Sequence, residues 1–594
     1  MEHKVIQDPI LVVAIDVGST HSGYAWQWRS AFKAKGSVEF NTNWGTGAPQ
    51  IHKTSTSLLL KYTDDKKELP SVVAFGHTAE SQHAHIQSDS QYQKEKHHYQ
   101  LFKRFKMLLY ELNKSNKSTD VQTESVDGFP QDILTIMFLF IKALKEDFLN
   151  KNKTFDTEDV MNKTVWVVTV PALWSQTTRG FMRKAAEMTG IADNNLLLAS
   201  EPECAAVYCI HLPQEQQINM CNLGMPGTKF LTADIGGGTG DLSAVEVQSD
   251  GKLKELCNVA GERVGGQQVN EAFSQAMYDS FEGKTVQQLF EEATPFEIMK
   301  LEREFEASKL SIIPDSSEEK IKLSTPKLVR EYITNNKIKF VDGAPISYNK
   351  NEETLEVNRV FVREKLFKTP CDLINATILK VLKEQPEIKI VVLVGGFAES
   401  GIVKQNVGDN IKKTFPDVKV VVPTSPFRAV LTGAVLFGHD PFIYKSRISR
   451  ATYGVRTNTI FKEATHNPSK KWFDEENKVH RCKDVFDIHV KIGDSVSLNE
   501  ALEAKTYTPL YKAQKEISIP VYESSEVGPT DGSVMYTTDS GCREIANIKV
   551  EIPTAEESSK RGVSVRMIYG GTQLSVIAEC AHNGKECPAV IRFN

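Results

Sequence analysis

Two segments of this chain combine an aspartate, several glycines and hydroxyl side chains. The first reads IDVGST at residues 15–20, and the second, roughly two hundred residues later, reads ADIGGGTGD at residues 233–241. Each follows an apolar run that predicts a buried strand, so each aspartate should lie where a strand ends and a tight turn begins. Glycines in such a turn allow backbone N–H groups to approach phosphate oxygens, because a Cβ atom would collide there. The duplication therefore predicts a nucleotide held between two lobes by two phosphate-binding hairpins.

The polar side chains of these segments fit that chemistry. The carboxylates of Asp16 and Asp234 are suited to hold a hydrated Mg²⁺ or to orient a water molecule. The hydroxyl groups of Ser19, Thr20 and Thr239 can donate to phosphate oxygens. One such segment could be an ordinary hairpin, since Asp and Gly are common turn residues. Two copies in the same strand-turn-strand setting favour the phosphate-binding interpretation.

Two further sites follow predicted strands. Glu201 comes directly after the apolar run LLLAS at residues 196–200, and it should lie at a strand's carboxyl end, where ligand clefts of α/β sheets form. The paired glycines Gly395 and Gly396 follow the run IVVLV at residues 390–394. Because bare backbone accommodates a flat base or ribose, this pair is a candidate for the adenosine side of the site.

Composition indicates a large soluble protein. The 594 residues are 40% hydrophobic with a net charge of -5, which predicts about three to four domain-sized units and argues against nucleic acid as a partner. No signal peptide pattern is evident at the start, and the most apolar stretch, residues 133–144, is too short for a transmembrane segment and predicts a buried helix. The nine cysteines contain no Cys-x-x-Cys pair, which favours reduced thiols in the cytoplasm, with the nucleus as a second compartment.

These pieces occur in the order found in actin, the sugar kinases and the ATPase of the seventy-kilodalton heat-shock proteins. The segments VTVPA at 168–172 and EP at 201–202 and the second hairpin resemble the heat-shock branch, and TYGV at 452–455 and CKDVFD at 482–487 resemble its divergent heat shock 70 kDa protein 12 subgroup. The resemblance implies an α/β, actin-like fold of two lobes around a nucleotide cleft. Lobe I would span 8–225 with an insertion at about 41–163, lobe II 226–445 with an insertion at about 263–380, and a β-rich domain 446–594.

The resemblance also implies roles for individual residues. The first phosphate loop would contain Asp16, Gly18, Ser19 and Thr20, and the second Asp234, Gly236, Gly237, Gly238 and Thr239. Asp16 and Asp234 would hold Mg²⁺ through water, and Glu201 and Asp241 would complete the metal and water network. A lysine from the first lobe's insertion would position the attacking water. Lys103 is the nearest match, and Lys106 is a competitor.

On the adenosine side, the pattern is altered. The implied contacts to ATP or ADP are Gly265, Gly266, Glu306, Lys309, Gly395, Gly396 and Phe397. Leu310 stands where the family has an arginine that stacks on adenine, and Phe397 stands where it has a small polar residue. We therefore expect unusual base contacts, in which the ring of Phe397 or Phe427 stacks on the base.

The segment that joins the second lobe to the tail differs from the family's acidic, leucine-rich linker. It reads FIYKSRISR at residues 442–450, so Lys445, Arg447 and Arg450 must stay solvated or find carboxylates. This predicts weak coupling between nucleotide and tail. Alternating patterns at 488–492, 517–521 and 547–552 predict antiparallel strands of a β-sandwich, and Pro520 predicts that its own strand lies at a sheet edge.

Three functions remain open from the sequence. The first is an ATP-binding chaperone that hydrolyses ATP slowly to ADP and holds a protein client. The second is a nucleotide-gated adaptor that binds a folded protein partner with little or no hydrolysis. The third is an actin-fold kinase of small molecules, which is the weakest because both carboxylate-bearing turns are already assigned to phosphate and metal.

Overall fold

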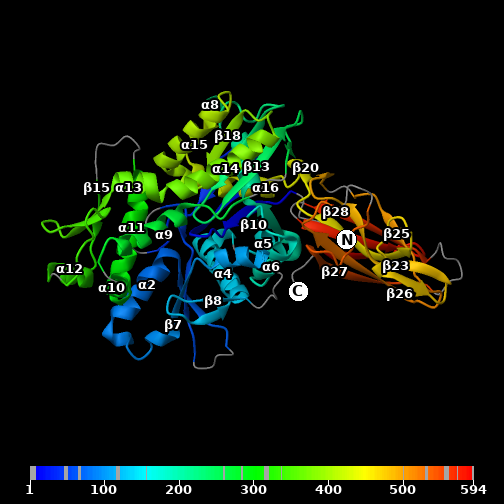
Figure 1. The fold of residues 1–594 in the computed structure, drawn as a ribbon, viewed down its shortest axis with the longest axis horizontal. Coiled ribbons are helices and arrows are strands. Elements are labelled where there is room, and N and C mark those ends of the chain that lie inside the picture. The colour runs from blue at the N-terminus through cyan, green and yellow to red at the C-terminus, as the bar shows by residue number, and fades with distance from the viewer. Residues whose placement is uncertain are drawn as a thin grey trace.

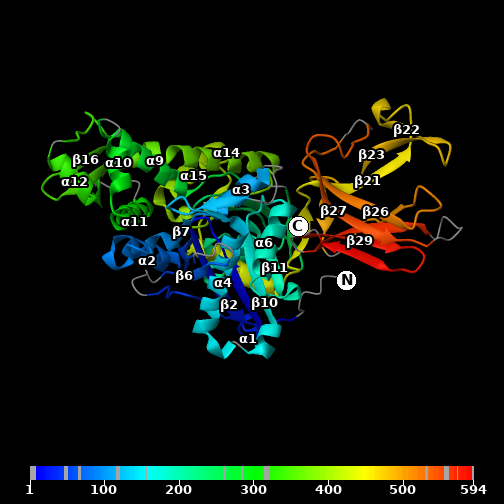
Figure 2. The ribbon, with the colours of Figure 1, turned by 90° about the horizontal axis from the view of Figure 1, so that it is seen from below.

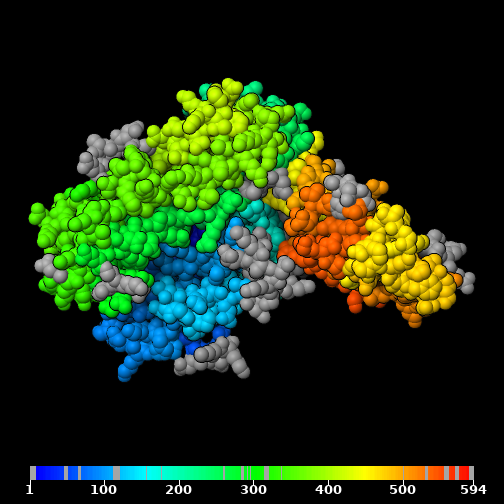
Figure 3. Space-filling view, viewed as in Figure 1, coloured from blue at the N-terminus to red at the C-terminus, as the bar shows by residue number. Residues whose placement is uncertain are grey.

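The computed structural model describes residues 8–45, 51–63, 68–114, 121–155, 157–257, 261–282, 285–312, 320–335, 337–498, 501–528, 533–553, 561–570 and 573–590. Two lobes lie against each other, blue to cyan for the first and green for the second, and a β-rich part in yellow to red extends from one end (Figure 1). The space-filling view shows the same division, with the β-rich part reaching away from the two lobes (Figure 3).

The first lobe is built on a six-stranded sheet with the path β11-β10-β1-β2-β3, in which β4 also pairs with β2. The strands are β1 (Leu11–Asp16), β2 (His21–Trp28), β3 (Glu39–Phe40), β4 (Thr54–Ser55), β10 (Thr164–Val170) and β11 (Leu196–Ser200). Strands β1, β10 and β11 are parallel and buried along their whole length, as their apolar runs predict.

The predicted buried helix at residues 133–144 is confirmed as part of α4 (Ile133–Lys151). Asp132 caps the amino end of α4, because its carboxylate accepts a hydrogen bond from the Thr135 N–H at 2.8 Å. α4 packs against α6 (Gln176–Glu187) and against β1. Within the described residues, no helix is both long and apolar enough to cross a membrane.

The second lobe repeats this arrangement in a seven-stranded sheet with the order β19-β18-β12-β13-β14-β20-β24. The strands are β12 (Lys229–Ile235), β13 (Gly240–Val247), β14 (Leu253–Glu255), β18 (Ile390–Val394), β19 (Lys419–Val421), β20 (Tyr444–Ile448) and β24 (Ser495–Ser497). In each lobe an antiparallel hairpin lies beside a parallel strand: β1 and β2 beside β10, and β12 and β13 beside β18. The duplication of the two sequence segments therefore extends to the topology.

Two closely packed helices join the two lobes. α7 (Glu201–Ile210) of the first lobe packs against α16 (Ala429–His439), which also contacts β1 and β10. A Cβ atom on Gly433 would overlap the carbonyl group of Cys204, so glycine is required for this approach. This packing fixes the carboxyl end of β11, and hence Glu201, relative to the second lobe.

Each lobe carries an insertion, and the two insertions meet on the far side of the hairpins. The first contains β5 (Ser57–Lys61), β6 (Ser71–Phe75), α2 (Gly76–Ser88), β7 (Tyr99–Lys103) and α3 (Lys106–Lys114). The second contains α9 (Gly266–Asp279), α10 (Thr285–Glu292), α11 (Pro295–Ser311), β15 (Lys320–Ser324), α12 (Lys327–Thr334), β16 (Ile346–Asn349) and β17 (Thr354–Asn358). α2 lies against α11, where Arg303 pairs with Glu80 at 3.1 Å (Figure 2).

The join between lobe and tail is part of the second lobe's sheet. It forms β20, which pairs with β14 on one side and with β24 of the tail on the other. Arg447 pairs with Glu203, and Arg450 pairs with Glu203 at 3.2 Å and with Glu255 at 3.3 Å. Of the two outcomes predicted for the basic residues, both arginines find carboxylates, whereas Lys445 is exposed.

The tail consists of two antiparallel sheets that share a core. One has the order β22-β23-β21-β26-β27, formed by β22 (Lys471–Asp474), β23 (Val479–Val490), β21 (Thr452–Ile460), β26 (Glu516–Ser524) and β27 (Cys542–Glu551). The other has the order β25-β28-β29-β30, formed by β25 (Lys505–Tyr507), β28 (Val563–Gly570), β29 (Gln573–Cys580) and β30 (Glu586–Val590). Val521 and Val576 are among the buried residues of the core.

The prediction that Pro520 marks an edge strand is wrong. β26 lies between β21 and β27. Its pairing with β21 extends only from Ser524 to Val521, so at Pro520 the strand is paired on one side alone, with Asn547 of β27. The proline is tolerated because the pairing of β26 with β21 has ended at this position, so its missing N–H removes no hydrogen bond to β21.

Candidate nucleotide site

The two predicted phosphate hairpins face each other across the junction of the lobes. Asp16 ends β1 opposite Gly23 of β2, and Asp234 lies opposite Asp241 in the second hairpin. A Cβ atom on Gly237 would overlap the Thr20 side chain, and one on Gly238 would lie 2.8 Å from the Cβ atom of Ser19. The structure therefore brings both segments together, with their glycines at the point of closest approach.

At Gly237 a glycine is required because a side chain would have no space, and not because the backbone conformation is unusual. Gly237 does not have a positive φ, and the neighbouring Thr20 is what excludes a side chain. Gly265 lies equally close to the second hairpin, because its Cβ atom would be 2.5 Å from the carbonyl oxygen of Gly236. Gly395 has φ of 90° and would place a Cβ atom 2.5 Å from Asp234 Oδ1, so both conformation and space demand glycine there.

Four predicted carboxylates gather at the base of the hairpins. Asp16 accepts hydrogen bonds from the Thr169 hydroxyl and from the Lys53 ammonium group, both at 2.6 Å. Glu201, the first residue of α7, pairs with Lys106 at 2.6 Å. Asp241 accepts a hydrogen bond from the Ala172 N–H at 3.2 Å. These side chains come from β1, α7 and the second hairpin, so the cluster exists only once the lobes are assembled.

Burial and neighbouring charges shift the pKa values of the four carboxyl groups. Burial raises the pKa of Asp234 well above its usual range, and the charges of Glu201 and Asp241 raise it further. Burial, together with the charges of Asp16 and Asp241, raises the pKa of Glu201 to about 7 against the opposing effect of Lys106. Burial also raises the pKa of Asp241. At Asp16 burial acts in the same direction, but the ammonium groups of Lys53 and Lys106 outweigh it and lower the pKa.

Lys103, the nearest match to the family's lysine, does not pair with any of these four carboxylates in the described structure. Lys103 lies at the meeting of the two insertions, where its amine is 3.7 Å from Glu80 and 3.6 Å from Glu302. Lys106, its competitor, is the one that contacts Glu201. Lys53 also reaches the carboxylates, and sequence reasoning missed it, because a single lysine in a loop carries no local signal.

The predicted adenosine side is assembled from α9, α11 and the turn after β18. Lys309 is completely buried and donates hydrogen bonds to Glu306 at 2.7 Å and to the carbonyl oxygen of Gly266 at 3.0 Å. Gly396 faces open space. Phe397 is only 3% exposed, because its ring stacks on Phe367 with centroids 5.6 Å apart. It belongs to the lobe's core here and presents no free face to a base.

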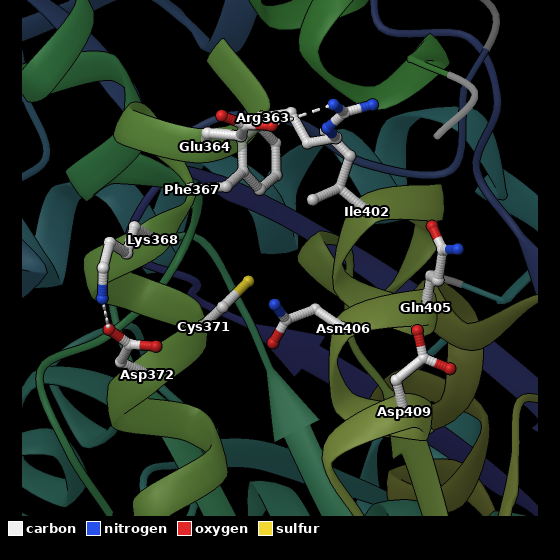
Figure 4. Close-up of a pocket in the computed structure, with 10 residues that line it drawn as sticks. All are labelled: Arg363, Glu364, Phe367, Lys368, Cys371, Asp372, Ile402, Gln405, Asn406 and Asp409. Atoms are coloured by element: carbon white, nitrogen blue, oxygen red, sulfur yellow. Dashed lines mark hydrogen bonds and ion pairs between the residues drawn. The ribbon is translucent and has the colours of Figure 1, made fainter. Parts of the chain in front are cut away.

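A cavity of about 300 Å³ lies behind this stack, between α14 (Lys368–Glu384) and α15 (Gly401–Thr414) (Figure 4). Phe367 and Ile402 form its apolar part, and Cys371 and Asn406 point into it from facing helices. None of the predicted site residues lines the cavity. It is therefore separate from the space between the hairpins.

Fold and site together define a two-lobed, actin-like nucleotide-binding protein of the ATPase type. This chain belongs to the Hsp70 family, whose model, described as "Hsp70 protein", matches residues 59–439. It is 26% identical to human heat shock 70 kDa protein 12A over 96% of this chain and 90% of that protein. It is 27% identical to human heat shock 70 kDa protein 12B over 98% of this chain and 91% of that protein, and 26% identical to mouse heat shock 70 kDa protein 12A over 98% and 91%. The family binds nucleotide together with a divalent metal.

Proposed function

We propose that this chain binds Mg-ATP between its lobes, hydrolyses it slowly to ADP and acts as a molecular chaperone. The observation that carries the proposal is the pair of facing hairpins above one shared group of carboxylates. Backbone N–H groups of the glycine turns and the hydroxyls of Ser19, Thr20 and Thr239 would bind the phosphates. Membership of the Hsp70 family supports nucleotide as the ligand.

The carboxylate cluster fits a divalent cation held through water, since no group of three or more His, Cys, Asp or Glu side chains among the described residues is arranged to hold one directly. The ammonium groups of Lys53 and Lys106 pair with two of the four carboxylates, Asp16 and Glu201, which leaves negative charge unbalanced when all four are ionised. Burial raises the pKa values of Glu201, Asp234 and Asp241, and neighbouring carboxylates raise those of Glu201 and Asp234 further. When bound, Mg²⁺ would supply positive charge to the phosphate oxygens. Asp16 and Asp234 would hold its water shell.

The same side chains can serve hydrolysis. Glu201 follows the carboxyl end of β11 and Asp241 lies near the amino end of β13, and both can accept hydrogen bonds from a water molecule placed in line with the terminal phosphate. Lys106, held by Glu201, can orient that water or stabilise charge on the phosphate. The first prediction for Lys103 stays a prediction, but its ion pairs with Glu80 and Glu302 place it in the contact between the insertions.

An unfolded client would distinguish a chaperone from other functions. In a chaperone, binding of apolar peptide to the β-rich tail would alter the lobes. Saturating amounts of an unfolded peptide should then raise ATP turnover of the full-length protein by at least about threefold, which corresponds to roughly 0.7 kcal/mol. Steady-state phosphate release and nucleotide titration measure turnover and affinity. A folded, non-client protein is the control, and unchanged turnover with tight ATP binding would contradict the chaperone.

A nucleotide-gated adaptor is the second candidate, and one observation favours it. The join forms an internal strand of the second lobe's sheet, and its arginines are tied to both lobes, through Glu203 of α7 and Glu255 of β14. Such an anchor presents the tail as a fixed surface, which suits a folded partner. ATP binding without peptide-stimulated turnover would be the expected result.

The anchor also makes a prediction about the join. If the chain is an adaptor, we expect proteolysis across residues 442–450 to be slow and to differ little between the ATP and ADP states, because Arg447 and Arg450 are held by carboxylates. Glu203→Gln should destabilise the anchor by about 3–5 kcal/mol, because it leaves a buried arginine without its charge partner, and should make the segment cleavable in both states. Limited proteolysis with mass spectrometry measures this.

The matched control is Asp250→Asn, which removes an exposed carboxylate 4.0 Å from Lys445 and should leave cleavage unchanged. Strong protection of the segment in only one nucleotide state would contradict weak coupling. A contact through which coupling could act is present, because Arg450 donates to the carbonyl oxygen of Ala172, whose N–H binds Asp241.

A further inference from the structure

Lys53 is held rigidly against the first phosphate hairpin. It immediately precedes β4, which pairs with β2 so that Thr54 lies opposite Ser22. The next residues extend this contact, since the Thr56 N–H donates to the carbonyl oxygen of Thr20 and the Thr56 hydroxyl donates to that of Gly18, both at 2.8 Å. The backbone that carries Lys53 is therefore fixed to the hairpin itself.

The side chain of Lys53 crosses the hairpin to reach its carboxylate. Its stem passes Gly23, where a Cβ atom would lie 3.2 Å from Lys53 Cγ, and its ammonium group contacts Asp16 Oδ2 at 2.6 Å. Lys53 is 21% exposed and Asp16 5% exposed. The charges of Asp234 and Glu201 also act on this ammonium group. Lys53 thus places a positive charge between carboxylates of both lobes, on the oxygen of Asp16 that Thr169 leaves available.

We propose that Lys53 is a tethered cation of the phosphate site, which makes nucleotide binding less dependent on a divalent metal. The inference rests on the proposed binding of ATP between the lobes. A nucleotide triphosphate that approached four carboxylates without any cation would be strongly repelled. An ammonium group already fixed on Asp16 offsets part of this repulsion without a metal ion.

The test compares ATP affinity of the full-length protein with excess Mg²⁺ and with EDTA. We expect removal of Mg²⁺ to weaken binding by the wild-type chain less than about tenfold, and we expect Lys53→Met to widen this gap by at least about tenfold, because without either cation nothing offsets the repulsion between Asp16 and the phosphates. Lys53→Arg should retain the small gap because it keeps the charge. Isothermal titration measures the affinities.

Two further variants make the result specific. Lys53→Gln keeps a hydrogen bond to Asp16 without the charge, so it should behave like Lys53→Met. If Lys53→Met fails to fold, Lys53→Gln still tests the inference. Lys61→Met is the control, because Lys61 lies on β5 beside Glu95 and is 41% exposed. It should leave both affinities unchanged.

The outcomes separate this inference from the proposed function. If Lys53→Met changes the ATP affinities with and without Mg²⁺ equally, or changes neither, the ammonium group is an ordinary ion pair of the first lobe. That result would overturn the inference and leave the proposed function standing. A loss of more than about tenfold on removing Mg²⁺ from the wild-type chain would also overturn it. If the wild-type chain binds ATP in neither condition, the proposed function fails, and the inference fails with it.

Discussion

Gly237→Val is expected to abolish nucleotide binding. The glycine lies where the two hairpins approach most closely, and any Cβ atom there would overlap Thr20 of the opposite lobe. A valine side chain would therefore force the hairpins apart and fill the space in which the phosphates would bind. We expect a loss of affinity beyond about a hundredfold, roughly 2.7 kcal/mol, measured by titration with a fluorescent ATP analogue.

A second glycine provides the control for this variant. Gly408 lies on α15, and a Cβ atom there would meet no other atom within 4 Å. Gly408→Val should therefore keep wild-type affinity, and valine is a better helix former than the glycine that it replaces. Thermal unfolding of both variants reports whether the lobes remain folded. Wild-type ATP affinity in Gly237→Val would mean that this hairpin does not approach phosphate.

Asp234→Asn is expected to cripple the handling of Mg-ATP without unfolding the chain. An amide preserves the shape of the side chain but removes the charge that would organise the metal's water shell, and such losses typically cost about tenfold to a hundredfold. Because burial raises the pKa of Asp234, ionising this carboxyl opposes folding, so the neutral amide should leave the unfolding midpoint unchanged or raise it. Turnover, Mg-ATP affinity and thermal unfolding measure the three effects.

Asp16→Asn should weaken Mg-ATP handling in a similar way but should lower the unfolding midpoint. The difference arises because Asp16 holds the ammonium group of Lys53, which would lose its charge partner. Asp250→Asn, at an exposed aspartate, is the common control. Near-normal turnover in both site variants would mean that these carboxylates only cap turns.

Local sequence was enough to predict the parts of this protein that depend on neighbouring residues. The hairpins at 15–20 and 233–241 could be recognised because strand, turn and glycine requirements all lie within a few residues. The position of Glu201 followed from the strand before it. The buried helix at 133–144 and the tail strands followed from apolar patterns, since period and burial are written along one segment.

The tertiary structure alone decided which distant side chains share the site. Lys53 and Lys106 reach the carboxylates, whereas Lys103 lies between the insertions, because the pairing of β4 with β2 and the course of α3 set these positions. Phe397 is a core residue because Phe367 lies against its ring. The fit of Pro520 inside a sheet depends on where the pairing with the neighbouring strand β21 ends. In each case, the deciding partner lies far away in sequence, and its contact is fixed only by packing of the assembled lobes and sheets.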